Sequence, residues 1–297
     1  MPARPRIFVD GEHGTTGLRI HERLADRDDI ERLHIAHGDR RDPDMRERLL
    51  READIAILCL PDDASREAAA MVEGHGTRLI DASTAHRTDP DWTFGFVELT
   101  AGHAERIAGA DRVSNPGCYS TGAIALLRPL TERGVLERAA PIAINAVSGY
   151  SGGGKSLIAE METPDAPPHF LYAMGLSHKH VPEITAHALL ERPPVFSPSV
   201  GRFAQGMIVQ VPLFLDGFSR DDLHAALAEH YAGGEYVEVA PRGNVERVDP
   251  TALNGTNRMR LHVFGNETQA VLVAVLDNLG KGASGACVQA MDLMLER

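Results

Sequence analysis

The chain has 297 residues, 43% of them hydrophobic, and a formal net charge of -12 at pH 7. Because such a chain has no basic excess with which to neutralise phosphates, its composition excludes a nucleic-acid scaffold. No apolar run approaches the roughly 18 residues of a membrane-spanning helix, and the amino terminus lacks the pattern of a signal peptide. We therefore expect a cytoplasmic protein of two domains, with neither nucleic acid nor a membrane as a partner.

Strand-like and helix-like stretches alternate through the first third of the chain. The pattern predicts short apolar strands at residues 6–10, 33–36, 54–60 and 78–81, and helices at 18–24 and 65–72. Alternation of this kind is typical of an α/β fold with a Rossmann-type, doubly wound parallel sheet. We expect this sheet to form a first domain of residues 1–117.

The first predicted strand leads into a loop that contains Gly11, Gly14 and Gly17, and a helix follows. Glycine lets a backbone approach a pyrophosphate closely, and the start of a helix presents free N–H groups to it. The spacing predicts a dinucleotide-binding loop, although glycines at these positions are also typical of a plain tight turn.

Two arginines, Arg40 and Arg41, follow the second predicted strand, where a dinucleotide fold meets the adenosine ribose. Basic side chains at this place favour a 2′-phosphate, and hence NADP, whereas an acidic residue favours NAD. A solvated charged loop is the alternative interpretation.

The chain has three cysteines and no CxxC pair, which excludes a disulfide framework and a structural zinc site. Cys118 follows Asn-Pro-Gly and precedes an apolar run, 124–127, with a helical pattern. A helix amino terminus lowers the pKa of a thiol, so this cysteine is the candidate nucleophile. Cys59 lies within an apolar strand and Cys287 within the last predicted helix, so both are expected in the core; an inert buried cysteine remains the alternative for Cys118.

The segment "GYSGGGKS", residues 149–156, matches the P-loop pattern GxxxxGK[ST]. A P-loop NTPase is therefore an alternative, with the strand that ends at Asp277 as its magnesium-binding strand. The predicted parallel sheet precedes this motif, however, and no further βα units follow it. If the segment is not a P-loop, we expect it to form another kind of anion site that uses Lys155.

The remainder of the chain has a different texture. Prolines interrupt it at 164–168 and 193–198, while 207–215, 258–265 and 269–277 have the pattern of antiparallel strands. We expect a second, α+β domain at 118–276. Residues 277–297 end in a helix from 283 that is expected to return to the first domain.

A thiolate nucleophile needs an acid/base partner, and the segment "SHKHVPEI" offers His178 and His180, with Glu183 close by. One histidine is expected to transfer the proton and the other to orient the substrate. No third credible ligand accompanies the pair, so no metal site is predicted.

Taken together, these segments resemble those of N-acetyl-gamma-glutamyl-phosphate reductases, in the shorter form of that family. The resemblance runs in order along nearly the whole chain, through the segments "GEHGTTG", "DASTAHR", "SNPGCYSTGA", "SGYSGGGKS", "SHKHVPEI" and "DNLGKGASGACVQAMDLML". It implies the two-domain plan of semialdehyde dehydrogenases, with an NADP-binding Rossmann domain, an α+β dimerisation and catalytic domain, and assembly into a homo-oligomer, either a dimer or a tetramer.

The resemblance also implies a reaction of arginine biosynthesis. In it, NADPH reduces N-acetyl-L-glutamyl 5-phosphate to N-acetyl-L-glutamate 5-semialdehyde and phosphate through a thioester on the cysteine. The catalytic residues are then Cys118 and His180, with His178 as the second choice of acid/base. The expected contacts with the acyl-phosphate substrate are Arg87, Asn115, Ser148, Gly149, Lys155 and His178. The expected contacts with NADP are Gly11, Gly14, Thr15, Thr16, Gly17, Arg40, Arg41, Ser83 and Asn278.

Three other functions remain to be distinguished from this one. Aspartate-semialdehyde dehydrogenase shares the two-domain plan and the thiol chemistry, a P-loop NTPase would hydrolyse nucleotides, and a non-catalytic nucleotide sensor would need no nucleophile. The cysteine and histidine segments favour the N-acetylglutamyl enzyme.

Overall fold

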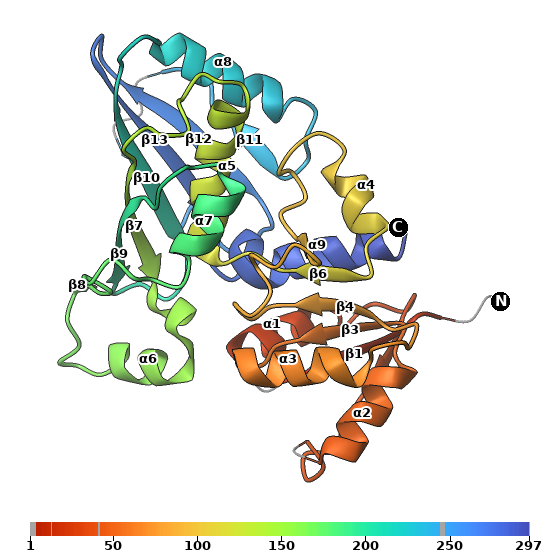
Figure 1. Cartoon of the computed structure of the whole chain (residues 1–297). Coiled ribbons are helices and arrows are strands. Elements are labelled where there is room, and N and C mark those ends of the chain that lie inside the picture. Colours follow the sequence, from red (N-terminus) through yellow and green to blue (C-terminus); the bar gives the residue numbers. More distant parts are fainter. Residues whose placement is uncertain (1–3, 13, 41, 244–246, 297) are drawn as a thin grey trace. The chain divides into compact units, whose positions relative to one another are not determined.

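The computed structural model describes residues 4–12, 14–40, 42–243 and 247–296 (Figure 1). The chain divides into two units. Unit 1 comprises Met1–Val97, Gly102–Pro116 and Ala283–Arg297, and unit 2 comprises Glu98–Ala101 and Gly117–Gly282.

Unit 1 is built on a parallel sheet of six strands in the order β2-β1-β3-β4-β6-β5. The strands are β1 (Arg6–Asp10), β2 (Glu31–Leu33), β3 (Ile55–Leu58), β4 (Arg78–Asp81), β5 (Thr93–Phe94) and β6 (Arg112–Ser114). The helices are α1 (Thr15–Arg23), α2 (Pro43–Glu52), α3 (Asp62–Met71), α4 (His103–Ala108) and α9 (Gly285–Met294). This arrangement confirms the predicted doubly wound sheet.

Both faces of this sheet are covered, as the continuous apolar strands predict. Successive side chains of a strand point to opposite faces. In β3, Ile55 and Ile57 join a core with residues of α1, α4 and α9, whereas Ala56 and Leu58 join a core with residues of α2 and α3. The last helix, α9, is thus part of the unit 1 core.

The predicted strand at 33–36 is wrong in its position, because the ladder with β1 runs through Glu31–Leu33. Leu33 and Ile35 do pack against the core beneath α2 and α3. Burial of alternate side chains therefore continues past Leu33, although the hydrogen-bonded ladder has ended there. The predicted helices at 18–24 and 65–72 begin three residues late, since α1 starts at Thr15 and α3 at Asp62.

Unit 2 contains a mixed sheet in the order β11-β12-β13-β10-β7-β9-β8. The strands are β7 (Ala143–Gly149), β8 (His169–Leu171), β9 (Val195–Gly201), β10 (Met207–Phe214), β11 (Val237–Val239), β12 (Met259–Gly265) and β13 (Gln269–Leu276). The pairs β10/β13 and β12/β13 are antiparallel, which confirms that prediction.

The helices of unit 2 are α5 (Cys118–Glu132), α6 (Gly154–Met161), α7 (Val181–His187) and α8 (Arg220–His230). The apolar helix α5 packs on β10 and β13 (Figure 1). A Cβ at Gly122 would lie 2.8 Å from Cγ2 of Val209, so this glycine lets α5 approach the sheet closely. The position of Cys118, at the start of α5, follows from this packing.

The prediction that prolines at 193–198 interrupt the chain holds for Pro193 and Pro194, which precede β9, and is wrong for Pro198, which lies inside this strand. Proline is tolerated in a strand where its missing N–H is not needed by a neighbour. Here its carbonyl still accepts a hydrogen bond from the amide of Tyr172, 3.3 Å away. No helix among the described residues is both long and apolar enough to cross a bilayer.

Candidate active site

Cys118 is the first residue of α5 and is partly buried. Its predecessor, Gly117, has extended backbone angles and caps the helix. The aligned peptide dipoles favour a negative charge at this end of a helix. The structure therefore places the thiol at the amino terminus of a helix, the position that the sequence predicted.

The other two cysteines differ from Cys118 in their surroundings. Desolvation, together with the nearby carboxylates of Asp81 and Asp10, raises the pKa of the Cys59 thiol to about 12. Burial also raises the pKa of Cys287 well above its ordinary value. Both thiols stay protonated at neutral pH, which agrees with the predicted core role.

Glu183 links the predicted histidine to the start of α5. Its Oε2 accepts a hydrogen bond of 3.2 Å from the amide of Gly117, and its Oε1 lies 3.9 Å from Nε2 of His180. The side chains of Glu183 and His180 are 1% and 6% exposed, so this carboxylate is held away from bulk water. One buried carboxylate therefore holds the residue before the nucleophile and lies beside the imidazole.

His178 has both ring nitrogens engaged. Its Nδ1 accepts a hydrogen bond of 3.1 Å from the amide of His180, so Nε2 must carry the proton of the neutral ring. That nitrogen lies 3.2 Å from the hydroxyl of Tyr172. Burial raises the pKa of Tyr172 to about 12, and the nearby charge of Cys118 contributes to the rise. Tyr172 thus stays protonated close to the thiol.

A glycine abuts the nucleophile from a distant part of the chain. A Cβ at Gly282 would lie 2.8 Å from Cβ of Cys118 and 3.2 Å from its Cα. Gly282 belongs to a π-helical turn, Gly280–Ser284, that follows β13. The next residue back, Lys281, is fully buried, and its Nζ lies 2.7 Å from a carboxylate oxygen of Glu98. Burial lowers the pKa of Lys281, and the Glu98 carboxylate partly offsets this effect.

The glycine-rich segment after β7 has its first amides occupied. The N–H groups of Gly149, Tyr150 and Ser151 donate to carbonyl oxygens within residues 203–206, at 2.9 to 3.0 Å. A P-loop would instead direct its N–H groups at phosphate. The strand before the motif, β7, lies in a mixed sheet, antiparallel to β10 and parallel to β9, whereas a P-loop follows a strand of a parallel sheet. The occupied amides and the mixed sheet therefore argue against the P-loop interpretation.

Of the predicted anion contacts in this segment, Ser148 is buried and donates to the carbonyl of Gly149, 3.0 Å away. Lys155 is exposed in the first turn of α6, where its ammonium is accessible to an anion.

Asn278 lies next to the glycine-rich segment in unit 2, at the end of β13. Its Oδ1 accepts a hydrogen bond of 2.8 Å from the amide of Gly206, and its Nδ2 donates to the hydroxyl of Ser151 at 3.0 Å. Both ends of the side-chain amide thus tie β13 to neighbouring loops. Each end keeps a further donor or acceptor position, so these bonds are compatible with the predicted contact with nicotinamide.

The glycine loop of unit 1 closes tightly after β1. Gly11 has a φ of +87°, and a Cβ there would lie 2.3 Å from the carbonyl oxygen of Cys59. A Cβ at Gly17 would lie 2.5 Å from the carbonyl oxygen of Gly11, and Gly14 caps α1. Glycine is therefore required by the fold of the loop. Thr15 and Thr16 lie partly buried in the first turn of α1, so the residues fit a diphosphate cradle at a helix amino terminus.

The predicted 2′-phosphate contacts are only partly described. Arg40 is exposed, with Nη1 3.4 Å from Nδ1 of His37, and Arg41 lies outside the described residues. A third arginine escaped the sequence analysis. Nη2 of Arg46, in α2, lies 2.8 Å from Oδ2 of Asp10, at the end of β1, and both side chains are largely buried.

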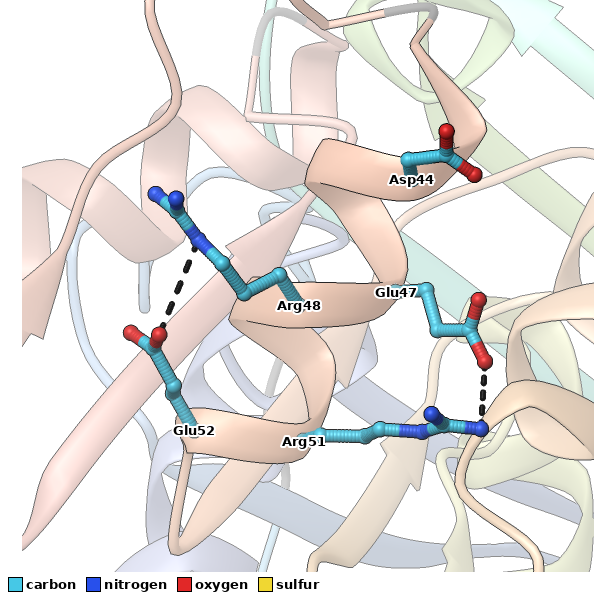
Figure 2. A pocket seen from close by; sticks show the side chains of 5 residues that line it. All are labelled: Asp44, Glu47, Arg48, Arg51 and Glu52. Atoms are coloured by element: carbon cyan, nitrogen blue, oxygen red, sulfur yellow. Dashed lines mark ion pairs between the residues drawn. The ribbon is translucent and has the colours of Figure 1, made fainter.

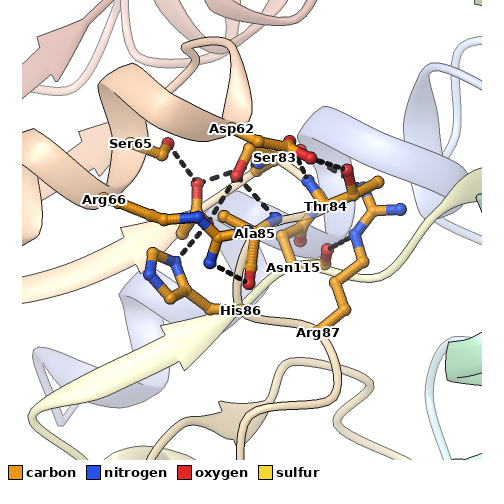
Figure 3. Close-up of polar contacts among 11 residues, drawn as sticks. Asp62, Ser65, Arg66, Ser83, Thr84, Ala85, His86, Arg87 and Asn115 are labelled. Atoms are coloured by element: carbon orange, nitrogen blue, oxygen red, sulfur yellow. Dashed lines mark hydrogen bonds and ion pairs between the residues drawn. The ribbon is translucent and has the colours of Figure 1, made fainter.

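Ser83 belongs to a buried hydrogen-bond network around the carboxylate of Asp81 (Figure 3). Asp81 accepts from the side chains of Ser65, Ser83 and His86, each at 2.7 Å. Burial by itself raises the pKa of Asp81, but these bonds outweigh it and hold the pKa below its ordinary value. The network fixes the loop after β4.

Arg87 and Asn115, two predicted substrate contacts, lie together in unit 1. Nε of Arg87 donates to the carbonyl of Asn115 at 3.0 Å, as Figure 3 shows. Nδ2 of Asn115 donates to the carbonyl of Ala283 at 3.1 Å. The remaining predicted substrate contacts belong to unit 2.

A surface hollow along α2 is not a candidate site for catalysis or ligand binding (Figure 2). It is lined by Asp44, Glu47, Arg48, Arg51 and Glu52. The two arginines each pair with a glutamate four positions away. Such pairs stabilise an exposed helix surface and leave little net charge for a ligand.

Comparison with known proteins identifies the family. A family model described as the NAD binding domain of semialdehyde dehydrogenase matches residues 6–107, and one described as the dimerisation domain of semialdehyde dehydrogenase matches residues 118–278. Proteins named N-acetyl-gamma-glutamyl-phosphate reductase, from Brucella anthropi and Rhizobium meliloti, are each 58% identical over 98% of this chain and 99% of their own length. The chain belongs to the N-acetyl-gamma-glutamyl-phosphate reductase family.

Solved structures show that the fold of this reductase family member extends to distant relatives. The aspartate semialdehyde dehydrogenase II of Vibrio cholerae matches with a TM-score of 0.74 at 16% identity, over 99% of both chains. An aspartate semialdehyde dehydrogenase from Candida albicans, described with NADP, matches with a TM-score of 0.67 at 15% identity, over 99% of both chains. At these identities the comparison establishes the fold.

Sequence reasoning missed three parts of the site of this reductase family member. Glu183 was noted only as a neighbour of the histidines, Gly282 only as part of a family segment, and Arg46 not at all. The sequence shows a carboxylate next to the histidines, but the hydrogen bond between Glu183 and Gly117 joins segments that are far apart in the sequence. Only the folded chain reveals such contacts.

Proposed function

We propose that this chain reduces N-acetyl-L-glutamyl 5-phosphate with NADPH to N-acetyl-L-glutamate 5-semialdehyde and phosphate, a step of arginine biosynthesis. The observation that carries the proposal is the placement of Cys118 at the start of α5, with Glu183 bonded to the residue before it and His180 beside Glu183. The identity of 58% to reductases of this name supports the choice of substrate.

The first half of the reaction uses residues of unit 2. His180 takes the proton of the Cys118 thiol as the sulfur attacks the acyl carbon, and the bond to phosphate breaks with release of the anion. The helix dipole favours the sulfur as an anion before attack. The product is a thioester on Cys118, and Glu183 stabilises the protonated His180 beside it.

The second half reduces the thioester to the aldehyde. When bound, NADPH supplies the hydride that adds to the thioester carbon. The resulting thiohemiacetal oxyanion on Cys118 collapses, the carbon–sulfur bond breaks, and the sulfur receives the proton from His180. The glycine loop, whose Gly11 and Gly17 leave no room for a Cβ, would hold the dinucleotide diphosphate, and Arg40 and Arg41 would hold its 2′-phosphate.

We assign the acid/base role to His180 rather than His178. Nδ1 of His178 accepts a main-chain hydrogen bond, so protonation of this ring would break that bond. His178 and Tyr172 instead form a rigid wall beside the thiol. Ser148, Gly149, Lys155, Arg87 and Asn115 are the proposed substrate contacts, and Ser83, Thr15, Thr16, Gly14 and Asn278 complete the proposed cofactor contacts.

The test is the reverse reaction, in which the aldehyde, phosphate and NADP⁺ yield NADPH. We expect phosphate-dependent turnover with N-acetylglutamate 5-semialdehyde, its abolition in Cys118→Ala, and a fall in kcat of about 10²- to 10⁴-fold in His180→Asn with unchanged NADPH affinity. His178→Asn is the matched control, because it should affect KM more than kcat. Turnover with aspartate semialdehyde in place of the N-acetylated substrate would refute the proposed substrate, and equal turnover in Cys118→Ala would refute the thioester.

We further propose a cytoplasmic homo-oligomer, either a dimer or a tetramer. Among the described residues of unit 2, five large apolar side chains are exposed, and interfaces of homodimers are rich in such surface. They are Leu171, Met174, Leu176, Val195 and Phe214. Light scattering after size exclusion would return the mass of more than one chain, and a single-chain mass would contradict the proposal.

A further inference from the structure

Three metal-ligating side chains meet beside the glycine loop, on three different segments of unit 1. Glu12 belongs to the loop, His21 to α1, and His34 follows β2. One ligand atom from each lies within 4.8 Å of those of the other two. Oε2 of Glu12 is 2.6 Å from Nε2 of His21. The rings of His21 and His34 stack, with centroids 5.8 Å apart and planes 21° apart.

Two imidazoles and a carboxylate form a donor set that suits zinc, cobalt and nickel ions. Bonds of about 2.0 to 2.2 Å place two donors of a tetrahedral ion about 3.4 Å apart. The short contact between Glu12 and His21 must therefore open, and the other contacts, none wider than 4.8 Å, must close by at most about 1.4 Å. His34 is exposed, so its ring can turn without moving the core. We propose that Glu12, His21 and His34 bind one divalent ion of this class, with a fourth position open to water.

The alternative is a plain ion pair between Glu12 and His21 that holds the loop. An ion pair engages only two of the three groups and assigns no role to the imidazole of His34, which stacks on that of His21. An ion shared by both neutral rings uses all three groups. The side chains of His21 and Glu12 are 20% and 18% exposed, which removes most of the competing water and still allows an ion to enter.

The site would couple the ion to the loop that we propose for NADP, so this consequence rests on the proposed function. A Cβ at Gly17 would lie 2.8 Å from Cα of Glu12, so the main chain of Glu12 is packed against α1. An ion would join this loop to the segment after β2. It would also replace the single negative charge of the three groups by a single positive charge, which favours an anionic dinucleotide.

The experiment uses the full chain as Cys118→Ala, so that the catalytic thiol cannot bind the added metal. The metal-free protein is titrated with Co²⁺, and the visible absorption of the bound ion is recorded; Zn²⁺ is then added as a competitor. We expect one equivalent to bind, and an affinity at least about tenfold weaker in His34→Ala and in Glu12→Gln. His75→Ala removes another exposed histidine of unit 1 and should bind as the parent does.

Two results would overturn the proposal. One is the absence of a stoichiometric Co²⁺ signal from the folded parent, and the other is unchanged affinity in both His34→Ala and Glu12→Gln. NADPH affinity, measured by fluorescence with and without Zn²⁺, should rise with the ion in the parent and stay constant in His34→Ala; no rise in the parent would overturn the coupling to the loop. A wild-type chain, with Cys118 intact, that binds the ion but lacks reductase activity would refute the proposed function and leave the metal site standing.

Discussion

Replacement of Gly282 by alanine should disable the nucleophile with little loss of folding. The new Cβ would lie 2.8 Å from Cβ of Cys118, whereas carbon atoms in contact are about 3.5 to 4.0 Å apart, so the overlap is about 1 Å. The other close atoms, Cα of Cys118 and the carbonyl oxygen of Asp277, are main chain, both at 3.2 Å, and no rotamer change relieves them. The start of α5 must therefore move by a sizeable part of that overlap.

A displacement of about 1 Å at reacting atoms costs roughly 10²-fold in rate, so we expect kcat to fall about 100-fold in Gly282→Ala. Overpacking of this kind costs about 1 to 3 kcal/mol, within the stability of about 5 to 15 kcal/mol of an ordinary protein. Helix propensity alone predicts the opposite sign, a gain of up to about 1 kcal/mol for alanine over glycine. The sign of the measured change in the free energy of unfolding thus distinguishes the effect of the close contact from that of helix propensity.

The assay combines the reverse reaction with the rate at which iodoacetamide alkylates Cys118 in the absence of cofactor. Gly243→Ala is the matched control, because a Cβ there would meet nothing within 4 Å. We expect slower turnover and a changed alkylation rate in Gly282→Ala alone, with unchanged NADPH affinity. A kcat within a factor of about two of wild type would show that the close approach of Gly282 does not position the thiol.

Three further predictions concern buried charges. Lys281→Met leaves the carboxylate of Glu98 without its ammonium partner, so it should lower the free energy of unfolding by about 3 to 5 kcal/mol in urea titrations. Adding Glu98→Gln to the same chain should partly restore stability, and additive losses in the double variant would contradict a direct pair. Asp81→Asn should lower the free energy of unfolding by about 2 to 4 kcal/mol and weaken NADPH binding in direct titrations, because the loop after β4 loses its anchor; unchanged NADPH affinity would separate that loop from the cofactor. Burial lowers the pKa of His230 below 6.5, so just below pH 6.5 the unfolded chain binds more protons than the folded one. The free energy of unfolding should therefore fall as the pH falls through this range, and less steeply in His230→Gln. Equal slopes in the two proteins would refute the role of His230 in this pH dependence.

The sheet of unit 1 was predictable in part because β1, β3 and β4 have apolar patterns of their own, whereas β5 and β6, of two and three residues, were not predicted. The run Ile55–Leu58 is apolar at every position, which fits a strand that is buried on both faces. Turn-forming residues bound each strand, and the helices between them have the length of crossovers. The start of α5 was equally legible, since Asn-Pro-Gly ends one element and an apolar helical pattern begins the next.

Contacts between distant segments were not predictable from local patterns. "GYSGGGKS" has the letters of a P-loop, but the amides of Gly149 to Ser151 are committed to residues 203–206, which no local pattern indicates. The pair of Arg46 and Asp10 likewise joins the start of α2 to the end of β1. Charge pairs and close approaches of this kind depend on the packing of the whole unit, so sequence reasoning identified the reactive residues and missed their supports.

The thiol, the imidazole and the carboxylate of the candidate site all belong to unit 2, whereas the glycine loop belongs to unit 1. Acylation of the thiol and hydride transfer from the dinucleotide can therefore take place as separate steps. Mixing the enzyme with acyl phosphate alone should release one burst of phosphate per active chain and leave a stable acylated protein, detectable by its added mass. Such an enzyme would be acylated by its substrate before it consumes NADPH. The acylated form would then be the resting state whenever the nicotinamide pool is oxidised.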